Sequence, residues 1–582
     1  MEEAMRRKLY PGEDRSEEPE EQFSGLRNNL ADQMADGYAG VRALGAGALN
    51  PPADLEWEEA EDDWSIEPTQ EREAAESGRS RIKLLLAALG IFAVALLPRI
   101  YFLYVVTDPD VLIPSWSNDT WHRWQIAYLS KEIGVQQDPA RLWDLKGLEY
   151  FWGVVHPLIS SALFSITGSV DVMILRWMTL VAGALNIVFV YLLGRRFWGE
   201  RVGAAGAAIA ILNPIIIFND QSGSVEPLSF LFLLAGIYFF PRRSFLAGLL
   251  LGLAALTRAE AWVMSGGLLF AALLVRESWS RKIVLGVGWA LPVLLYMKHL
   301  LDVTGNAIYP IYWNFLANAA GHWEFRAGYT DYQLAARPVL GAVFVIAVLA
   351  SAYVLWRRPR GYLLYLLGLG TTAFITGFIG LTAYLKSYEP WFWLTRFFVF
   401  PYIFLGLLAA IMFLIWLPSS LSGRLRTTVG WAGIVGLILA LQLAWPAVLH
   451  DVYPGYTSQT LARRQEEQGK SIAGWYPGGK VLIPEGIPQL TYAIVRYGGI
   501  EGQNLLGQMY GPDYYFEGGD ALQNWEIVGP RMWDWFESND VRMLVMNIYD
   551  QRFLRMIEEH PERFTYIGPV PYQALDIYWV ES

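Results

Sequence analysis

Cysteine is absent from the 582 residues of this chain. Its absence excludes disulfides, thiolate metal sites and cysteine nucleophiles together. Three familiar motifs are also missing: a glycine-rich phosphate loop that ends in Lys-Ser/Thr, a dinucleotide-binding fingerprint after a strand, and the zinc-binding sequence HExxH. Any domain outside a membrane must therefore be held together by packing, and the common nucleotide-binding and zinc-protease classes are not expected.

Charged residues are scarce, at 17%, whereas 54% of the residues are hydrophobic, 15% are aromatic, and the mean hydropathy is +0.26. This composition is too apolar for a soluble chain of this length, so the sequence predicts a membrane protein. Apolar runs of about 15 to 25 residues recur between residues 84 and 445, long enough in most cases to cross about 30 Å of hydrocarbon. We count about eleven such spans and predict an α-helical polytopic membrane domain over residues 79–446.

The lysines and arginines between the spans indicate the orientation of the chain. They gather at every second short loop, which is the pattern of cytoplasmic loops. The basic clusters are those before the first span at 79–83 and the loops 194–201, 241–243, 276–282, 356–361 and 422–428. The amino terminus is therefore expected in the cytoplasm, and an odd number of spans places the carboxyl terminus outside. Because topology accounts for the basic clusters, nucleic acid is not expected as a partner.

Two segments flank the membrane domain. Residues 1–78 carry 21 acidic and 7 basic side chains and few apolar ones, so we expect a disordered cytoplasmic tail. Residues 447–582 contain short apolar runs at 481–484, 543–548, 565–570 and 575–580, with helical stretches between them. This alternation predicts a small extracytoplasmic α/β domain.

Two of the predicted spans, 245–256 and 262–275, are short and are separated by Thr-Arg-Ala-Glu, which includes Arg258 and Glu260. Charges at this depth are tolerated only where they face protein or water. The two segments either cross the membrane or form a re-entrant hairpin, and the loop charges favour crossing. Arg258 and Glu260 can equally be a structural ion pair that holds the two helices together.

The first external loop, 107–155, contains the sequence SWSNDTWHRWQIAY at 115–128. Apolar residues recur at helical spacing from 120 to 133, and we predict an amphipathic helix on the outer membrane surface with its tryptophans at headgroup level. Asp119 stands where it can cap this helix. An acid followed closely by His122 is also a candidate site, in which His122 contacts substrate, supports the structure or binds a metal.

Four motifs in this order resemble those of the GT-C superfamily of membrane glycosyltransferases, which use polyprenyl-phosphate-linked sugars, and in particular its mannosyltransferase-like members of glycosyltransferase family 39. The matching elements are the first-loop acid Asp119, with Asp108 and Asp110 of TDPD as weaker candidates; Glu226 in SVEPLSF; Arg258 and Glu260 in LTRAE; and Arg396 in LTRFFVFP.

The resemblance implies transfer of a sugar, with mannose the commonest guess, from a polyprenyl-phosphate donor to the hydroxyl of a glycan, lipid or protein acceptor outside a prokaryotic plasma membrane. Asp119 would act as the general base, Arg396 would bind the lipid phosphate, and the other matched residues would bind substrate. One carboxylate is enough for single-step attack with inversion, because the phosphate is already a good leaving group. No cofactor is expected, and a divalent cation remains an option.

Three other functional hypotheses stay open. Oligosaccharyltransferases share the first-loop pattern, but their Trp-Trp-Asp-Tyr-Gly motif is not matched by MWDWF at 532–536, and the Asp-Glu pair of protein O-mannosyltransferases is missing. Intramembrane arginine and glutamate also mark secondary transporters, although no convincing internal repeat is present. A non-catalytic scaffold that only binds lipid is the third alternative.

Overall fold

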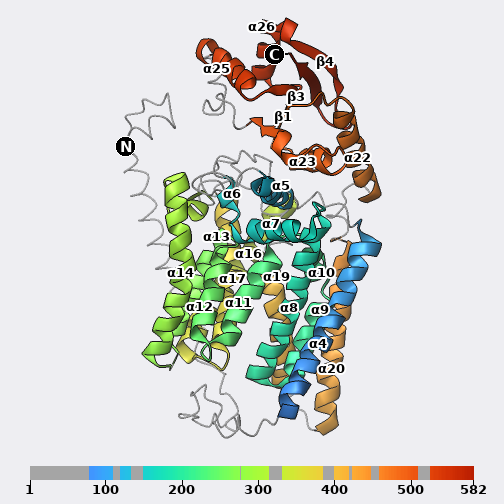
Figure 1. Ribbon diagram of the computed structural model, residues 1–582. Helices are drawn as coiled ribbons and strands as arrows, with labels where there is room; N and C mark the ends of the chain where they lie inside the picture. The colour runs from blue at the N-terminus through green and yellow to red at the C-terminus, as the bar shows by residue number, and fades with distance from the viewer. Residues whose placement is uncertain are drawn as a thin grey trace. The chain divides into compact units, whose positions relative to one another are not determined.

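The apolar segments of the sequence fold as helices, and the end of the chain folds as a small sheet with helices, in the computed structural model of Figure 1. The structure describes residues 78–108, 118–132, 148–275, 277–313, 331–384, 399–417, 423–446, 448, 458–484, 486–508 and 525–581. The tail predicted over residues 1–78 therefore lies almost wholly outside the described residues. The predicted class, a helical membrane protein with a small carboxyl-terminal α/β domain, is confirmed.

The helices of the membrane part are α4 (Gly78–Tyr101), η1 (Phe102–Val106), α5 (Asn118–Glu132), α6 (Leu148–Phe151), α7 (Val155–Thr167), α8 (Met173–Trp198), α9 (Glu200–Ile211), α10 (Pro214–Gln221), α11 (Glu226–Phe239), α12 (Ser244–Ala255), α13 (Ala259–Leu273), α14 (Trp279–Thr304), α16 (Asp331–Arg357), α17 (Tyr362–Tyr384), α19 (Val399–Ile411), η4 (Met412–Trp416) and α20 (Gly423–Leu441).

Among the described residues, five helices are long and apolar enough to cross a membrane: α4 with η1, α8, α14, α16 and α20. The bent pair α9 and α10 is a sixth candidate. The shorter apolar segments are α11, α12, α13, residues 362–378 of α17, and residues 401–416 of α19 and η4; they run in the same bundle, whereas α7 lies crosswise at one end (Figure 1). These helices match the predicted spans in number, but five of them are short, so the count of about eleven stays a prediction. The central helix is α8. An 18-residue apolar stretch of α8 is 67% buried, whereas the corresponding stretch of α4 is 11% buried.

The bend between α9 and α10 has a local cause. Pro214 is the first residue of α10, and a proline cannot continue the hydrogen bonding of the preceding helix. The side chain of Asn213 caps the new helix by accepting from the amides of Ile215 and Ile216, at 3.0 and 3.3 Å. The two helices therefore meet at 67°. Helix α10 packs against α8, α4 and α19.

The short helices α12 and α13 form a hairpin whose tip lies at Leu256 and Thr257. The amides of Val154 and Val155 donate to the Leu256 carbonyl at 2.9 and 3.2 Å, so the tip lies against the start of α7. The other end of the hairpin meets basic residues, because Lys282 Nζ donates to the Leu273 carbonyl at 2.8 Å. The hairpin therefore reaches from a predicted cytoplasmic loop to the end of the bundle that bears α7, which favours the crossing alternative.

The carboxyl-terminal domain contains a five-stranded sheet in the order β2-β1-β3-β5-β4. Strands β1 and β3 are parallel neighbours, β2 is parallel to β1, and β5 runs antiparallel to both β3 and β4. The elements are α22 (Ser458–Gly474), β1 (Lys480–Ile483), α23 (Pro488–Arg496), η7 (Gly502–Asn504), β2 (Leu505–Gly507), α25 (Trp525–Ser538), β3 (Val541–Asn547), α26 (Gln551–Glu559), β4 (Phe564–Pro569) and β5 (Leu575–Val580). Four strands coincide with the predicted apolar runs, and only β2 was missed, because three residues give no readable pattern.

Candidate functional site

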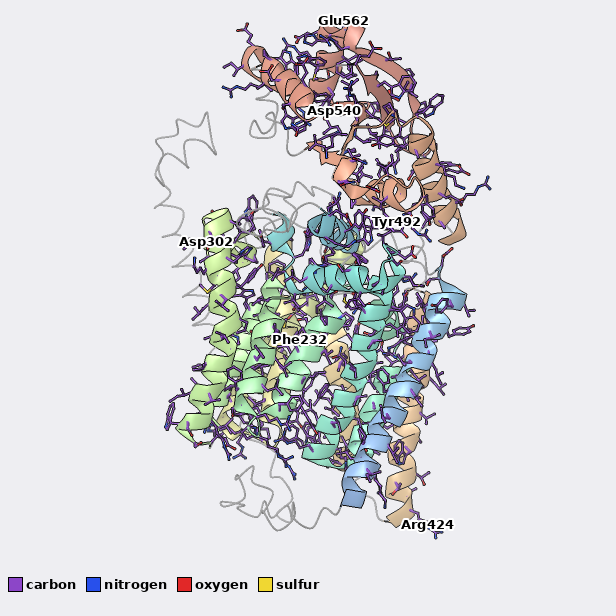
Figure 2. All side chains as sticks on the ribbon, in the orientation of Figure 1. Phe232, Asp302, Arg424, Tyr492, Asp540 and Glu562 are labelled. Carbon is purple, nitrogen blue, oxygen red and sulfur yellow. The ribbon has the colours of Figure 1, made fainter. Side chains whose placement is uncertain are left out.

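Helix α5 is buried between the membrane helices and the carboxyl-terminal domain, so the prediction of a helix on the membrane surface is wrong. Trp121 is 1% exposed and Trp124 is fully buried. Both indoles contact Tyr492 of α23, with ring centroids 5.0 and 4.9 Å apart, and Tyr492 is labelled in Figure 2. The apolar stripe of the sequence is real, but it faces protein, because the following domain supplies an apolar surface of its own.

Polar contacts fix α5 in this position. The indole nitrogen of Trp124 donates to the Val170 carbonyl, which follows α7, at 2.8 Å. From the other side, the amide of Gly502 in the carboxyl-terminal domain donates to the Tyr128 hydroxyl at 3.2 Å. Since α5 is anchored to both neighbours, its first turn has a defined place above the membrane helices.

A cluster of three charged residues gathers at the starts of two helices. Glu226 is the first residue of α11, Glu260 lies in the first turn of α13, and Arg258 immediately precedes α13 in an extended conformation. Arg258 donates from Nε and Nη2 to the two carboxylate oxygens of Glu260, both at 3.0 Å, and from Nη1 to Glu226. The positive ends of the helix dipoles favour carboxylates at both helix starts.

The tip of the hairpin holds this arginine in place. Gly153 adopts a φ of +86°, and a Cβ atom there would lie 2.4 Å from the Thr257 carbonyl oxygen. Glycine is therefore required, because a side chain would both strain the backbone and push the tip away. The segment before α7 thus closes tightly over Thr257, next to Arg258.

Asp119 lies in the first turn of α5 and joins this cluster. Its carboxylate is half-buried and interacts electrostatically with both Arg258 and His122. The structure therefore brings together five of the predicted site residues, contributed by α5, α11 and the start of α13. These are Asp119, His122, Glu226, Arg258 and Glu260.

His122 is held by a ring on one side and an amide on the other. Its imidazole stacks on Trp152 with centroids 5.1 Å apart, and Nδ1 lies 3.3 Å from Gln125 Oε1. Burial lowers the pKa of His122 from 6.5 to about 4, and the nearby Asp119 opposes this shift only in part. The ring is therefore neutral at pH 7.

Two further buried residues near this cluster were missed by the sequence reasoning. Arg123 is 1% exposed and acts electrostatically on both His122 and His156. His156 is fully buried in α7, donates from Nε2 to the Gly223 carbonyl at 3.1 Å, and interacts electrostatically with Glu226. A histidine in the apolar sequence VHPLIS offers no pattern that distinguishes such a contact from an ordinary buried ring.

The other predicted residues lie elsewhere or are not described. Asp108 follows η1, and its carbonyl accepts from Arg176 of α8, which also donates to Thr107 Oγ1 at 2.5 Å and to the Gln221 carbonyl at 2.9 Å. This arginine joins the end of the first span to the end of α10. Asp110 and Arg396 lie outside the described residues, so their predicted roles stay predictions.

A second buried ion pair lies inside the bundle. Arg99 of α4 donates from Nε and Nη2 to Asp220 Oδ2 at 2.8 and 2.6 Å, and the two side chains are 0% and 2% exposed. Gly183 of α8 makes room for it, because a Cβ atom there would lie 2.1 Å from Asp220 Cγ. An arginine near the end of an apolar run and an aspartate in the sequence FNDQ were the only sequence signals.

Among the described residues, no group of three or more histidine, aspartate or glutamate side chains has the arrangement of a metal site. The predicted option of a divalent cation stays open, because Asp110 and most of the first external loop lie outside those residues.

The sequence matches no family model and no curated protein. Several solved structures are similar, among them the following three. The apo oligosaccharyltransferase of Archaeoglobus fulgidus is 12% identical, with a TM-score of 0.44 over 85% of this chain and 74% of that one. ArnT from Cupriavidus metallidurans bound to undecaprenyl phosphate is 16% identical, with a TM-score of 0.45 over 86% and 97%. The arabinofuranosyltransferase AftD from Mycobacteria is 15% identical, with a TM-score of 0.44 over 87% and 40%.

All three are GT-C superfamily glycosyltransferases, the superfamily that the sequence motifs resemble. These identities and TM-scores are too low to assign a function. The case for a function therefore rests on the chain's own residues.

Proposed function

We propose that this protein is a membrane glycosyltransferase that moves a sugar, mannose in the first instance, from a polyprenyl-phosphate donor to an acceptor hydroxyl. The observation that carries the proposal is the interaction of Asp119 with Arg258, which itself pairs with Glu226 and Glu260, at one end of a bundle of apolar helices. A lipid-linked donor needs this setting, because its tail requires a membrane and its headgroup requires a polar site at the membrane boundary.

Asp119 is assigned as the general base. The acceptor oxygen attacks the anomeric carbon, its proton passes to the Asp119 carboxylate, and the bond between the anomeric carbon and the phosphate oxygen breaks with its electron pair on the phosphate. Attack from the face opposite the phosphate inverts the anomeric centre, and no enzyme nucleophile is required.

Arg258 is assigned to hold the carboxylates rather than the phosphate. It already donates to both oxygens of Glu260 and to Glu226, so its donors are largely used. The phosphate is left to Arg396, the residue that the resemblance to the superfamily assigns to it. In this arrangement Arg258 keeps Glu226 and Glu260 in fixed orientations, in which they bind the hydroxyls of the sugar.

The orientation of the chain is part of the proposal. The alternation of basic loops puts the α5 end of the bundle and the carboxyl-terminal domain outside the cytoplasm of a prokaryotic cell. A nucleotide-sugar donor is not available there, which favours a lipid-linked one.

The test uses purified protein in lipid vesicles with radiolabelled polyprenyl-phosphate-mannose and crude membrane acceptors, and it measures released lipid phosphate. Asp119→Asn is expected to lower the rate by about 10²-fold to 10⁴-fold, the contribution of one positioned base. The matched control is Asp302→Asn at the end of α14, where the carboxylate is 48% exposed and forms an ion pair with the exposed Lys298 at 2.8 Å. This control is expected to leave the rate unchanged.

Equal rates for wild type and Asp119→Asn would refute the assignment of the base and point to Asp108 or Asp110. A wild type that releases nothing from donors carrying several different sugars would refute the glycosyltransferase proposal and favour transport or lipid binding.

A further inference from the structure

A chain of side-chain contacts runs from the carboxyl-terminal domain to the proposed base. Thr491 of α23 accepts a hydrogen bond from Gln125 Nε2 at 2.9 Å, and Gln125 Oε1 lies 3.3 Å from His122 Nδ1. His122 in turn interacts electrostatically with Asp119, one helical turn away on α5. Gln125 and Thr491 are both fully buried.

We propose that Gln125, fixed by Thr491 of the carboxyl-terminal domain, is a positioning residue that sets the tautomer of His122. His122 Nε2 then accepts a hydrogen bond from a neighbouring hydroxyl of the acceptor, while the proton of the attacking hydroxyl stays directed at Asp119. This inference rests on the proposed glycosyl transfer, because it names how that same site holds the acceptor.

The hydrogen-bonding capacities of the groups carry the argument. A carboxamide has one oxygen that only accepts and one nitrogen that only donates. Because Gln125 Nε2 donates to Thr491, its oxygen is the atom that faces His122. An oxygen can only receive a proton there, so His122 Nδ1 carries the hydrogen and Nε2 keeps the lone pair.

The surroundings keep the ring in this state. Stacking on Trp152 fixes the plane of the imidazole, and Arg123 and Asp119 are the charged groups that act on it. The neutral ring is an acceptor at Nε2, and by binding a neighbouring hydroxyl of the acceptor it can align the attacking hydroxyl, whose proton passes to Asp119. The aromatic contacts of Tyr492 with Trp121 and Trp124 keep α23 against α5, which holds Thr491 within reach of Gln125.

The first experiment needs no substrate. The protein is labelled with ¹⁵N-histidine and studied in lipid by solid-state NMR at pH 7, and the signal of His122 among the six histidines is assigned by its loss in His122→Gln. The expected result is the tautomer with hydrogen on Nδ1. A hydrogen on Nε2 would overturn the proposal whatever the activity of the protein.

The second experiment compares Thr491→Val, which keeps the shape and removes the hydroxyl, with Thr491→Ser, which retains a hydroxyl. The valine variant is expected to shift His122 towards the other tautomer and to lower kcat by about tenfold, the rate equivalent of one lost hydrogen bond, with the donor KM unchanged. Serine is expected to restore both. The matched control is Thr376→Val, whose hydroxyl donates to a carbonyl of its own helix at 2.7 Å.

The outcomes separate the two proposals. A valine variant with unchanged tautomer and kcat would overturn the role of Thr491 and Gln125 while leaving the glycosyltransferase proposal intact. A protein with the expected tautomers but no transfer activity would refute the proposed function, and with it the role of His122 towards an acceptor. If the valine variant fails to fold, the tautomer in the wild type and in Thr491→Ser still decides the hydrogen-bonding argument.

Discussion

Replacing Arg258 by methionine would break the buried charge cluster while keeping much of the side-chain volume. In the wild type its guanidinium is 9% exposed, and its two partners differ, with Glu226 at 2% and Glu260 at 24% exposure. The substitution therefore leaves one carboxylate that water can reach and one that it cannot. The main cost is expected to come from Glu226.

The size of that cost follows from two limits. Removing one partner of a buried ion pair costs about 3 to 5 kcal/mol, because the remaining charge is uncompensated. Glu226 can escape this penalty by taking up a proton. Protonation costs about 1.36 kcal/mol for each pH unit above an ordinary glutamate pKa of about 4.3, which amounts to about 4 kcal/mol at pH 7. We therefore expect Arg258→Met to lower the free energy of unfolding by about 4 kcal/mol at pH 7 and by only about 1 kcal/mol at pH 5.

The assay is unfolding of the purified protein in mixed micelles by increasing fractions of sodium dodecyl sulfate, followed by tryptophan fluorescence. The double variant Arg258→Met with Glu226→Gln removes the stranded charge and is expected to be at least about 2 kcal/mol more stable at pH 7 than Arg258→Met alone. Lys298→Met removes an exposed pair with Asp302 and is expected to cost at most about 0.5 kcal/mol.

Three results would refute this reasoning. They are a cost below about 1 kcal/mol for Arg258→Met at pH 7, a cost that does not fall towards pH 5, and a double variant no more stable than the single one. Any of them would mean that water reaches Glu226 and that the cluster is not a buried one.

Two further predictions use the same unfolding assay. Gly183→Ala places a Cβ atom where the carboxyl of Asp220 lies and is expected to destabilise the protein by about 1 to 3 kcal/mol, whereas Gly266→Ala, with open space around it, is expected to be neutral or slightly stabilising. An equal effect of the two alanines would contradict the close packing of α8 on α10. The pKa of His122, lowered by burial to about 4, means that the unfolded chain takes up a proton at a higher pH than the folded chain does. Its contribution to stability is complete above about pH 6.5 and is lost as the pH falls towards 4, so the wild type should lose about 2 kcal/mol between pH 7 and pH 5 that His122→Gln does not lose.

The local elements of this protein could be predicted from its sequence where the chain signals them itself. The apolar runs of the membrane part and the β-rich runs at 481–484, 543–548, 565–570 and 575–580 became helices and strands close to their predicted places. Strand β2 (Leu505–Gly507) was missed, because it is defined by its pairing with β1 rather than by its own pattern. The prediction that α5 lies on the membrane surface was wrong for a related reason. An apolar stripe in the sequence does not indicate whether lipid or protein covers it.

For the candidate site too, the sequence determined some properties and the tertiary structure determined the others. The sequence by itself determined the membrane class, the likeness of the motifs to a glycosyltransferase superfamily, and the candidacy of Asp119, Glu226, Arg258 and Glu260. These follow from composition and from residue types at fixed spacing, which are properties of the chain. Only the tertiary structure decided that these residues meet, because 139 positions separate Asp119 from Arg258 along the chain.

The buried partners were likewise decided by the fold. The sequence does not reveal the burial of Arg123 and His156 or the pairing of Arg99 with Asp220, since a charge next to apolar residues can face water, lipid or another charge. The contact of Gln125 with Thr491 joins two helices 366 residues apart. Burial and pairing depend on what the rest of the chain brings alongside, and that is fixed only when the helices pack.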